Sequence, residues 1–562
     1  MLNFILGRNN SGKTEKIRAL IAERASENKK CILIVPEQFS FESERSILEK
    51  IGAQKMLNVD ILSFTRLAFV INEQYGKALN KTIDDGTRKV LMSLSLEALS
   101  GKLEYFKRFA SKPALLSNLL TFVTELKQCA VTPDEIAEIS GKTGNKSLGK
   151  KLSELSLIAA SYDALVSRSF FDDENLLTIA ADMISETDFF DGKAVYFDAF
   201  CGFTKQERNC IKSILPKAEN VFISLCTDRD LSREGVSVFE NVNSEFSHLK
   251  ECAAEQNVGV SSPEILNVKE DGRSPELVYL EKYLCGEESE PYKEECDNIV
   301  VCAAGNRADE ADFVACEIKK LLRCNPTLRC RNIAVIERTA GTYDKELSES
   351  FKKYGVPMFE DKRRPIGIQP VMVFVKCLLA LCAEGFSTES FMRLLKTGLT
   401  ALSGDEISEL ENYAFLWNID GSKWRRDFTE NPDGLGFDVT EKSQEKLIRL
   451  NDIRKRSVLP VLAFKKDFEE ADGEKKSRLI YEFLIKNGVT EKLREKVEYL
   501  ISSGDTVLCE EQDTVWATLM DMLGKMASAI GETVITAKRY SELFNILLSA
   551  VTLGSLPQEL DS

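Results

Sequence analysis

The chain has 562 residues, is 43% hydrophobic and 29% charged, and carries a formal net charge of −15 at pH 7. This length exceeds what one hydrophobic core usually holds, so several domains are expected. The apolar runs are too short for a membrane span. The acidic balance argues against nucleic acid covering the whole surface, although a local basic channel can still bind phosphates.

The cysteine and histidine content excludes several kinds of site. The 15 cysteines are scattered without a C-x-x-C pair, which argues against a disulfide framework, a zinc site or an iron–sulfur cluster built from this chain alone. His248 is the one histidine, so a His-centred catalytic triad is not expected. Reduced thiols and the absence of a signal-peptide pattern predict a cytoplasmic protein with no membrane segment.

A phosphate-binding motif stands at the start of the chain. Residues 7–14 read GRNNSGKT and fit the P-loop pattern, between an apolar strand at 2–6 and a helix at 15–21. Such a loop turns backbone N–H groups toward phosphate oxygens, while its lysine adds a positive charge and its threonine can ligate Mg²⁺. The expected nucleotide-binding residues are Gly7, Asn10, Ser11, Gly12, Lys13 and Thr14. The alternative is a plain turn that caps the helix.

The next elements alternate as in a parallel sheet. Strands are predicted at 30–35, 59–64, 194–197 and 220–225, with a helix at 41–51 and a long helical segment from 87 to 190. A linker is expected at 286–291. A second α/β region then has predicted strands at 298–303, 332–336 and 355–359, with helices at 309–322 and up to 354. Residues 370–530 have helical spacing again, and a last helix is predicted at 533–548.

Asp198 directly follows the strand at 194–197, the position of a Walker B carboxylate that holds Mg²⁺. An active helicase normally has Glu next in the chain to activate the attacking water, but here Ala199 and Phe200 follow. Glu207 could substitute only if its loop folds back. The sequence therefore favours nucleotide binding over rapid hydrolysis.

Two loops with aromatic residues, 35–41 and 62–69, follow predicted strands. Loops at the carboxyl ends of parallel strands form the usual ligand crevice, and aromatic rings there can stack bases. Each loop alone is more typical of core packing. Together, beside a P-loop and with Phe200 and Phe203 on a third loop, they favour a nucleic-acid site. Arg338, after the strand at 332–336, could reach a γ-phosphate from a facing domain or could be a surface arginine paired with Glu337. Basic clusters at 362–364, 423–426 and 454–456 are either local phosphate contacts or solvated helix faces.

These segments together resemble the AddB subunits of bacterial AddAB helicase–nucleases, which are related to UvrD-type superfamily 1 helicases. The resemblance lies in GRNNSGKT, VPEQFSFESE (35–44), SFTRLA (63–68), VYFDAFCGFTKQE (195–207), IAVIERTAGTY (333–343), YGVPMFEDKRRP (354–365), LLKTGL (394–399) and LGSLPQELDS (553–562). It covers essentially the whole chain in order.

The resemblance implies an α/β protein with two RecA-like P-loop-type parallel-sheet domains, each carrying a large helical insertion. The corresponding division is 1–86 and 191–290 for the first sheet domain, 87–190 for its insertion, 291–370 and 531–562 for the second sheet domain, and 371–530 for its insertion. Family members are about twice as long and end in a nuclease with an iron–sulfur cluster. The chain is therefore expected to be a fragment without the nuclease domain or the cluster.

The resemblance also implies a helicase-like module that binds ATP and Mg²⁺ without being the main motor, beside an AddA-type partner subunit that drives translocation. It implies contact with single-stranded DNA and duplex ends, and scanning for the recombination hotspot Chi. On that analogy the DNA-binding residues are Gln38, Ser40, Phe64, Arg66, Phe69, Phe200 and Phe203. Two alternatives stay open: a self-sufficient superfamily 1 helicase, and a scaffold with a vestigial P-loop.

Overall fold

The computed structural model describes residues 1–76, 83–107, 112–169, 173–227, 238–267, 273–283, 290–339, 341–358, 363–504 and 506–554. The chain forms two compact units, and both are discontinuous in sequence. The first contains Met1–Arg273, Lys282–Glu287 and Lys525–Gly531, and the second contains Ser274–Glu281, Glu288–Gly524 and Glu532–Ser562.

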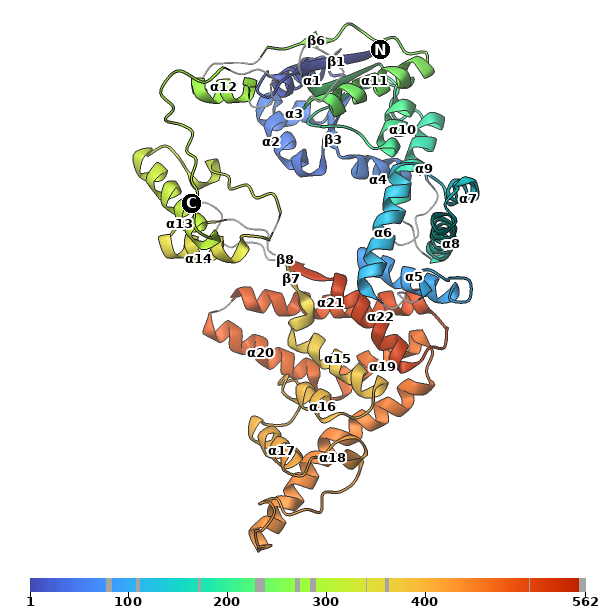
Figure 1. Cartoon of the computed structure of the whole chain (residues 1–562), viewed down its shortest axis with the longest axis vertical. Helices are drawn as coiled ribbons and strands as arrows, with labels where there is room; N and C mark the ends of the chain where they lie inside the picture. The colour runs from blue at the N-terminus through green and yellow to red at the C-terminus, as the bar shows by residue number, and fades with distance from the viewer. Residues whose placement is uncertain are drawn as a thin grey trace. The chain divides into compact units, whose positions relative to one another are not determined.

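The first unit is built on a six-stranded sheet in the order β3-β2-β4-β5-β1-β6, and every strand pairing in it is parallel (Figure 1). The strands are β1 (Leu2–Gly7), β2 (Cys31–Ile34), β3 (Val59–Leu62), β4 (Ala194–Phe197), β5 (Asn220–Cys226) and β6 (Glu264–Ile265). The first five confirm the strands predicted in this part of the chain. The short β6 was not predicted, because its two residues are exposed and pair only with Ile5 and Leu6 of β1.

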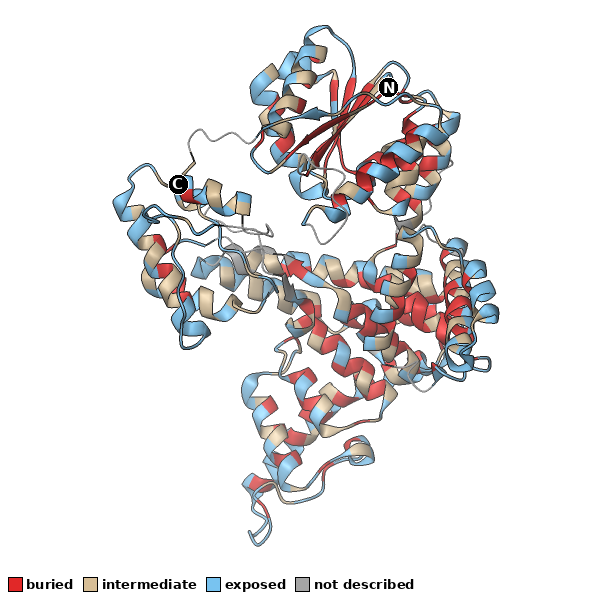
Figure 2. Ribbon diagram, turned by 45° about the horizontal axis from the view of Figure 1, so that its top comes forward, coloured by how far each residue is buried: buried red, intermediate tan, exposed pale blue. Residues whose placement is uncertain are grey.

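Helices cover both faces of this sheet, since its strands alternate apolar side chains between the two sides. On one face Ile5 and Leu33 pack against α1 (Lys13–Ser26) and α2 (Ser40–Ile51). The other face, which includes Phe4 and Leu6, lies against α4 (Phe64–Tyr75), α9 (Asp173–Glu186), α10 (Lys205–Ile214) and α11 (Glu240–Glu255). Figure 2 shows the strands as buried between these helices. The result is a three-layer α/β/α unit.

The segment predicted to be helical between β3 and β4 is confirmed as helices. It contains α5 (Asp85–Ala98), α6 (Pro113–Gln128), α7 (Pro133–Lys142) and α8 (Lys146–Ser169), and it leads into α9. The carboxylate of Glu154 on α8 accepts hydrogen bonds from the backbone N–H groups of Glu104, Tyr105 and Phe106 at 2.8–3.1 Å. This buried carboxylate fixes the loop after α5 to α8.

The second unit is mainly helical. The pair α13 (Arg307–Cys324) and α14 (Asp344–Tyr354) packs through Ala315, Ile318, Phe351 and Val356. A second group of helices surrounds the apolar α15 and includes a two-stranded antiparallel ribbon. Its elements are β7 (Arg363–Pro365), α15 (Pro370–Ala383), α16 (Thr388–Leu395), α17 (Gly404–Leu416), η5 (Gly421–Arg425), α18 (Glu441–Glu470), α19 (Gly473–Lys486), α20 (Val489–Ser503), α21 (Thr506–Ile530, whose residues from Lys525 onward belong to the first unit), α22 (Ala537–Ala550) and β8 (Thr552–Gly554).

The expectation of a second parallel sheet is not confirmed. Residues 298–303 and 333–336 are irregular, as are 356–358, and Val301 and Ile336 are 92% and 91% exposed. An apolar, β-branched run becomes a strand only when a neighbour receives its backbone hydrogen bonds, and these segments have no such neighbour among the described residues. Residue 359, Lys362, most of the expected linker (286–289) and the end of the last quoted motif (555–562) lie outside the described residues.

No helix among the described residues combines the length and the apolarity needed to cross a membrane.

Candidate functional site

The loop between β1 and α1 is a tight turn, in which the Ser11 backbone N–H donates to the Arg8 carbonyl at 3.3 Å. Asn10 and Gly12 have left-handed φ values of 56° and 87°. A Cβ on Gly7 would lie 2.4 Å from Ser11 Oγ and 2.8 Å from the Leu266 carbonyl oxygen, so only glycine fits there. Gly12 stands at the N-cap of α1 and has no side chain to cap the helix. The positive end of the helix dipole therefore faces the loop, which suits a bound phosphate.

The Lys13 side chain folds back onto the backbone of this loop. Its Nζ donates hydrogen bonds to the carbonyl oxygens of Gly7 at 2.8 Å and Arg8 at 2.7 Å. A phosphate could replace these carbonyls as the partner of the ammonium group, because an anion is the stronger acceptor. Thr14, half-buried in the first turn of α1, completes a residue set that fits a nucleoside triphosphate.

Asp198 lies at the same edge of the sheet as this loop. It follows β4, is 5% exposed, and its backbone N–H donates to the Ile34 carbonyl at 3.1 Å. Ser224 Oγ on β5 donates a hydrogen bond to Asp198 Oδ1. Since β5 lies between β4 and β1, Ser224 orients the carboxylate from the strand next to the loop-bearing strand. Ser224 was not predicted as a site residue, and its only signal in the sequence is a polar residue inside an apolar strand.

The residues after Asp198 do not supply a carboxylate of the kind found in working helicases. Ala199 has a left-handed φ of 66°, a conformation that costs a non-glycine residue about 1 kcal/mol. Glu207 Oε2 accepts a hydrogen bond from the Thr204 backbone N–H at 2.7 Å, and Thr204 Oγ1 accepts one from the Glu207 N–H at 3.2 Å. This reciprocal pair is a capping box at the start of α10, so the structure gives Glu207 a helix-capping role.

Arg338 is exposed and belongs to the second unit. Glu337, the surface partner considered for it, instead accepts hydrogen bonds from the backbone N–H groups of Gly341 at 2.7 Å and Tyr343 at 3.1 Å. An ion pair between Arg338 and Glu337 is therefore not seen in the structure.

Three polar residues of the expected DNA-binding set lie on the surface near the carboxyl edge of the sheet. Gln38 is exposed in the short η1 (Glu37–Phe39) after β2, and Ser40 is half-buried at the start of α2. Arg66 is exposed in the first turn of α4, and its backbone N–H is capped by Ser63 Oγ at 3.2 Å. Because β2 and β3 are paired parallel strands, their following loops lie at the same edge.

The expected aromatic contacts have another role. Phe64 and Phe203 are each 6% exposed and belong to the core on one face of the sheet. The Phe64 ring lies 5.5 Å from that of Phe200 and 6.1 Å from that of Phe203. Phe69 and Phe200 are partly buried against the same core. This burial argues against base stacking by Phe64 and Phe203, because the sequence spacing did not show which way these rings point.

Two other phenylalanines are better placed for stacking. Phe39 and Phe41, which flank Ser40, are 36% and 79% exposed. Both occur in the loop 35–41, whose aromatic residues follow a strand end, but neither was among the expected DNA-binding residues.

The basic clusters are partly structural. Arg454 is 3% exposed, and it donates hydrogen bonds to the Trp424 carbonyl at 3.0 Å and to the Asp427 carboxylate.

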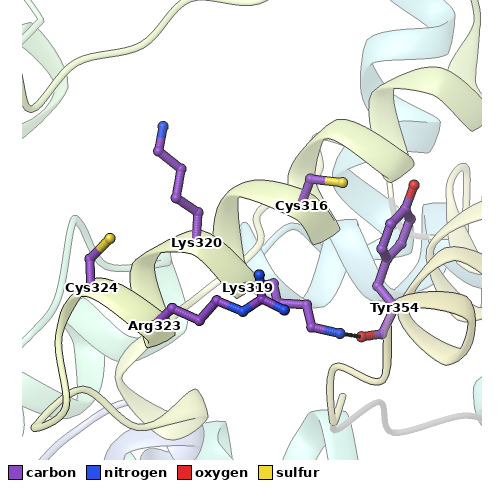
Figure 3. A pocket seen from close by; sticks show the side chains of 6 residues that line it. All are labelled: Cys316, Lys319, Lys320, Arg323, Cys324 and Tyr354. Atoms are coloured by element: carbon purple, nitrogen blue, oxygen red, sulfur yellow. Dashed lines mark hydrogen bonds between the residues drawn. The ribbon is translucent and has the colours of Figure 1, made fainter.

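A different group of cations lines a shallow hollow of about 450 Å³ on the second unit, where Lys319 Nζ donates to the Tyr354 carbonyl at 2.6 Å (Figure 3). Lys320 and Arg323 lie along the same helix, α13, and Cys316 and Cys324 complete the lining. This cluster was not predicted, although Lys319 and Lys320 are adjacent in sequence.

Comparison with known proteins gives a consistent result. Residues 4–281 match the family described as "ADDB, N-terminal". The chain is 29% identical to the B subunit of the ATP-dependent helicase/deoxyribonuclease of Acetivibrio thermocellus, covering 100% of this chain and 50% of that protein. The proteins of the same name from Clostridium acetobutylicum (29%) and Clostridium botulinum strain Hall (28%) match over 100% of this chain and 49% and 50% of their own lengths.

The chain thus spans about half the length of the curated relatives it matches. The family match covers the P-loop, Asp198 and the six-stranded sheet apart from the first two residues of β1. The alignments with the relatives run through both units. On these findings residues 4–281 belong to the AddB family, matching its N-terminal model, and the whole chain is similar to the B subunits named above.

Proposed function

We propose that this chain is the ATP-binding, single-stranded-DNA-scanning module of one subunit, the AddB type, of a two-subunit helicase/deoxyribonuclease that processes DNA double-strand ends for recombinational repair. The observation that carries the proposal is the glycine-lined loop between β1 and α1, with Asp198 held at the same sheet edge. The relatives share a name that describes one subunit of an ATP-dependent helicase/deoxyribonuclease, which supports the class of complex.

The loop residues are suited to bind ATP without hydrolysing it rapidly. A Cβ on Gly7 would clash with Ser11, and Gly12 has the left-handed φ that the turn requires, so the loop backbone can curl around a phosphate. Lys13 Nζ is bound to the carbonyls of the same loop, and Thr14 with Asp198 would hold Mg²⁺. Bound Mg²⁺ would neutralise charge on the β- and γ-phosphates. Ala199 carries no carboxylate, and Glu207 is engaged by the Thr204 backbone. We therefore assign the motor function of the complex to an AddA-type partner subunit.

The carboxyl edge of the sheet is the proposed path of single-stranded DNA. The exposed Gln38 and Arg66 can donate hydrogen bonds to base edges or phosphates, and the exposed rings of Phe39 and Phe41 can stack bases. This combination of stacking surfaces with hydrogen-bond donors suits a module that reads a short sequence such as Chi.

Fluorescence anisotropy of a labelled single strand tests this path. Arg66→Ala should weaken binding and flatten the plot of log affinity against log salt by about one unit, because one phosphate contact is lost. Phe41→Ala should cost about 1–3 kcal/mol of binding free energy with little change in salt slope, as expected for lost stacking.

The control is Arg478→Ala, which removes an exposed arginine that pairs with Glu474 on α19. It should bind like wild type. If Arg66→Ala and Phe41→Ala also bind like wild type at every salt concentration, the proposed DNA path is wrong.

A further inference from the structure

A cluster of lysines lies at the turn between α7 and α8 in the first unit, where the two helices run side by side (Figure 1). Residues 139–153 contain four lysines and no aspartate or glutamate, in a chain whose net charge is −15. We call these four residues the α7–α8 lysine patch: Lys142, Lys146, Lys150 and Lys151. The side chains of Lys142 and Lys150 are 72% and 71% exposed, and Lys146 is exposed as well.

The stability of the helices does not explain this patch. Lys146 and Lys150 lie in the first turns of α8, where the helix dipole favours acidic side chains and opposes cations. They are also four residues apart, a spacing at which like charges destabilise a helix. The patch therefore places charge at positions that cost stability, as expected of a surface that binds an anion.

The turn that carries the patch is ordered by its own contacts. Asn145 Oδ1 accepts hydrogen bonds from the backbone N–H groups of Ser147 at 3.0 Å and Leu148 at 3.2 Å, so the start of α8 is already capped. A Cβ on Gly149 would lie 3.0 Å from the Ser140 carbonyl oxygen, which shows how closely the two helices approach. The attraction for an anion therefore comes from the lysines, and a turn ordered before binding loses little conformational entropy when a ligand docks.

The carboxylates near the patch compensate only half of its charge. Two of them form exposed ion pairs, Glu138 with Lys142 and Glu104 with Lys150. Such exposed pairs are weak, so a phosphate can replace the carboxylate. Lys146 and Lys151 form no ion pair with the described residues. Further along the helices, Glu154 is buried and bound to backbone N–H groups, and Asp134 and Glu135 lie at the other end of α7.

The side chains of the turn fit a nucleic acid better than a protein. Protein–protein interfaces are depleted in lysine and have an apolar centre, whereas residues 140–151 offer one exposed large apolar side chain, Leu148, at 44%. Between the lysines stand Thr143, Gly144 and Ser147, which are small and let phosphate oxygens approach. Single-strand sites also need open aromatic rings, but Lys151 Nζ already lies over the Tyr105 ring, 5.8 Å from its centroid.

We infer that the α7–α8 lysine patch binds the phosphate backbone of double-stranded DNA without reading its sequence. The inference rests on the proposed function, in which the complex works on DNA ends, and it adds a duplex contact on elements other than those of the single-strand path. Lysine ammonium groups act as point charges, so contacts from this patch hold the duplex and carry no sequence information.

Fluorescence anisotropy with a labelled blunt-ended duplex, and with a single strand of the same length, tests the assignment. The double variant Lys146→Ala/Lys151→Ala removes the two lysines that have no ion pair. It should bind the duplex at least about tenfold more weakly at low salt and flatten the plot of log affinity against log salt by about two units, because two phosphate contacts are lost. Single-strand binding should be unchanged. The control, Lys29→Ala/Lys30→Ala, removes two exposed lysines before β2 and should bind both DNAs like wild type.

Each outcome decides a different point. Wild-type protein that binds neither DNA overturns the proposed function, and this inference with it. Wild type that binds the single strand but not the duplex overturns the duplex inference alone. The same holds if Lys146→Ala/Lys151→Ala, with an unchanged circular dichroism spectrum, binds the duplex as tightly as wild type and with the same salt slope. Equal weakening for both DNAs would assign the patch to the single strand instead. A double variant that keeps duplex binding but no longer co-purifies with the partner subunit would assign the patch to a protein contact.

Discussion

Two carboxylates near the end of β4 show how local contacts decide a residue's role. Asp198 is buried, and the Ser224 hydroxyl orients it at the edge that carries the phosphate loop. Glu207 is nine residues further along, and its carboxylate is bound to the Thr204 backbone. The T-x-x-E spacing of residues 204–207 is a recognisable capping signal in the sequence. That spacing favours a capping role for Glu207 over a catalytic one.

Glu207→Ala should therefore lower stability and leave catalysis unchanged. Loss of the capping box should cost about 1 kcal/mol, seen as a lower thermal midpoint. Glu135→Ala is the matched control, because Glu135 forms the same box with Thr132 at the start of α7 and should show a similar loss. ATP turnover per bound nucleotide should not change in either variant. A more than tenfold drop in turnover for Glu207→Ala alone would show that Glu207 is catalytic.

At the scale of elements, the sequence predicted the helices and strands that depend only on the local spacing of apolar residues. The apolar runs of β1, β2, β4 and β5, and the helices on both sides of them, were found because period-two and 3.6-residue spacing are properties of single segments. The predictions of strands at 298–303 and 332–336 were not confirmed, because a strand also needs a neighbouring strand from elsewhere in the chain to pair with. For the same reason the spacing of Phe64 and Phe203 did not reveal their burial, which arises only where α4 and the loop after β4 meet.

The attachment of the loop after α5 to α8 gives a pH-dependent prediction. Burial of Glu154 raises its pKa, but hydrogen bonds from the Tyr105, Glu104 and Phe106 backbone N–H groups outweigh this and leave the pKa below its ordinary value. The carboxylate therefore stabilises the fold at neutral pH, and this contribution is lost as pH falls below about 4.3 and through the lowered pKa.

Glu154→Gln should reduce stability by about 1–3 kcal/mol at pH 7, because an amide group cannot accept hydrogen bonds from all three backbone donors. Thermal midpoints of wild type and variant should converge as pH is lowered toward 3. Glu104→Gln is the control, since the Glu104 side chain forms an exposed pair with Lys150 at 3.1 Å and no other ion pair with the described residues. A wild-type advantage that persists undiminished at pH 3 would contradict this role for Glu154.

At the scale of the whole molecule, the net charge of −15 contrasts with the local features proposed to bind anions. The phosphate loop uses backbone geometry, the helix dipole and Lys13, so it does not require a basic surface. The order β3-β2-β4-β5-β1-β6 brings the loop after β1 and Asp198 after β4 to one edge, with a single strand between them. The sequence predicted both motifs, but the strand order and the orienting Ser224 emerged only from the fold.

Isothermal titration of the purified chain with Mg-ATP tests the central claim most directly, using wild type, Lys13→Ala and the control Lys29→Ala. Lys29 is an exposed lysine beyond the far end of α1 and pairs with Glu27 at 2.8 Å. We expect wild type and Lys29→Ala to bind one ATP with the same affinity, and Lys13→Ala to bind at least about tenfold more weakly, as expected when a charge-assisted hydrogen bond to phosphate is lost. Wild-type protein that takes up no ATP, or Lys13→Ala that binds as tightly as wild type, would contradict the account.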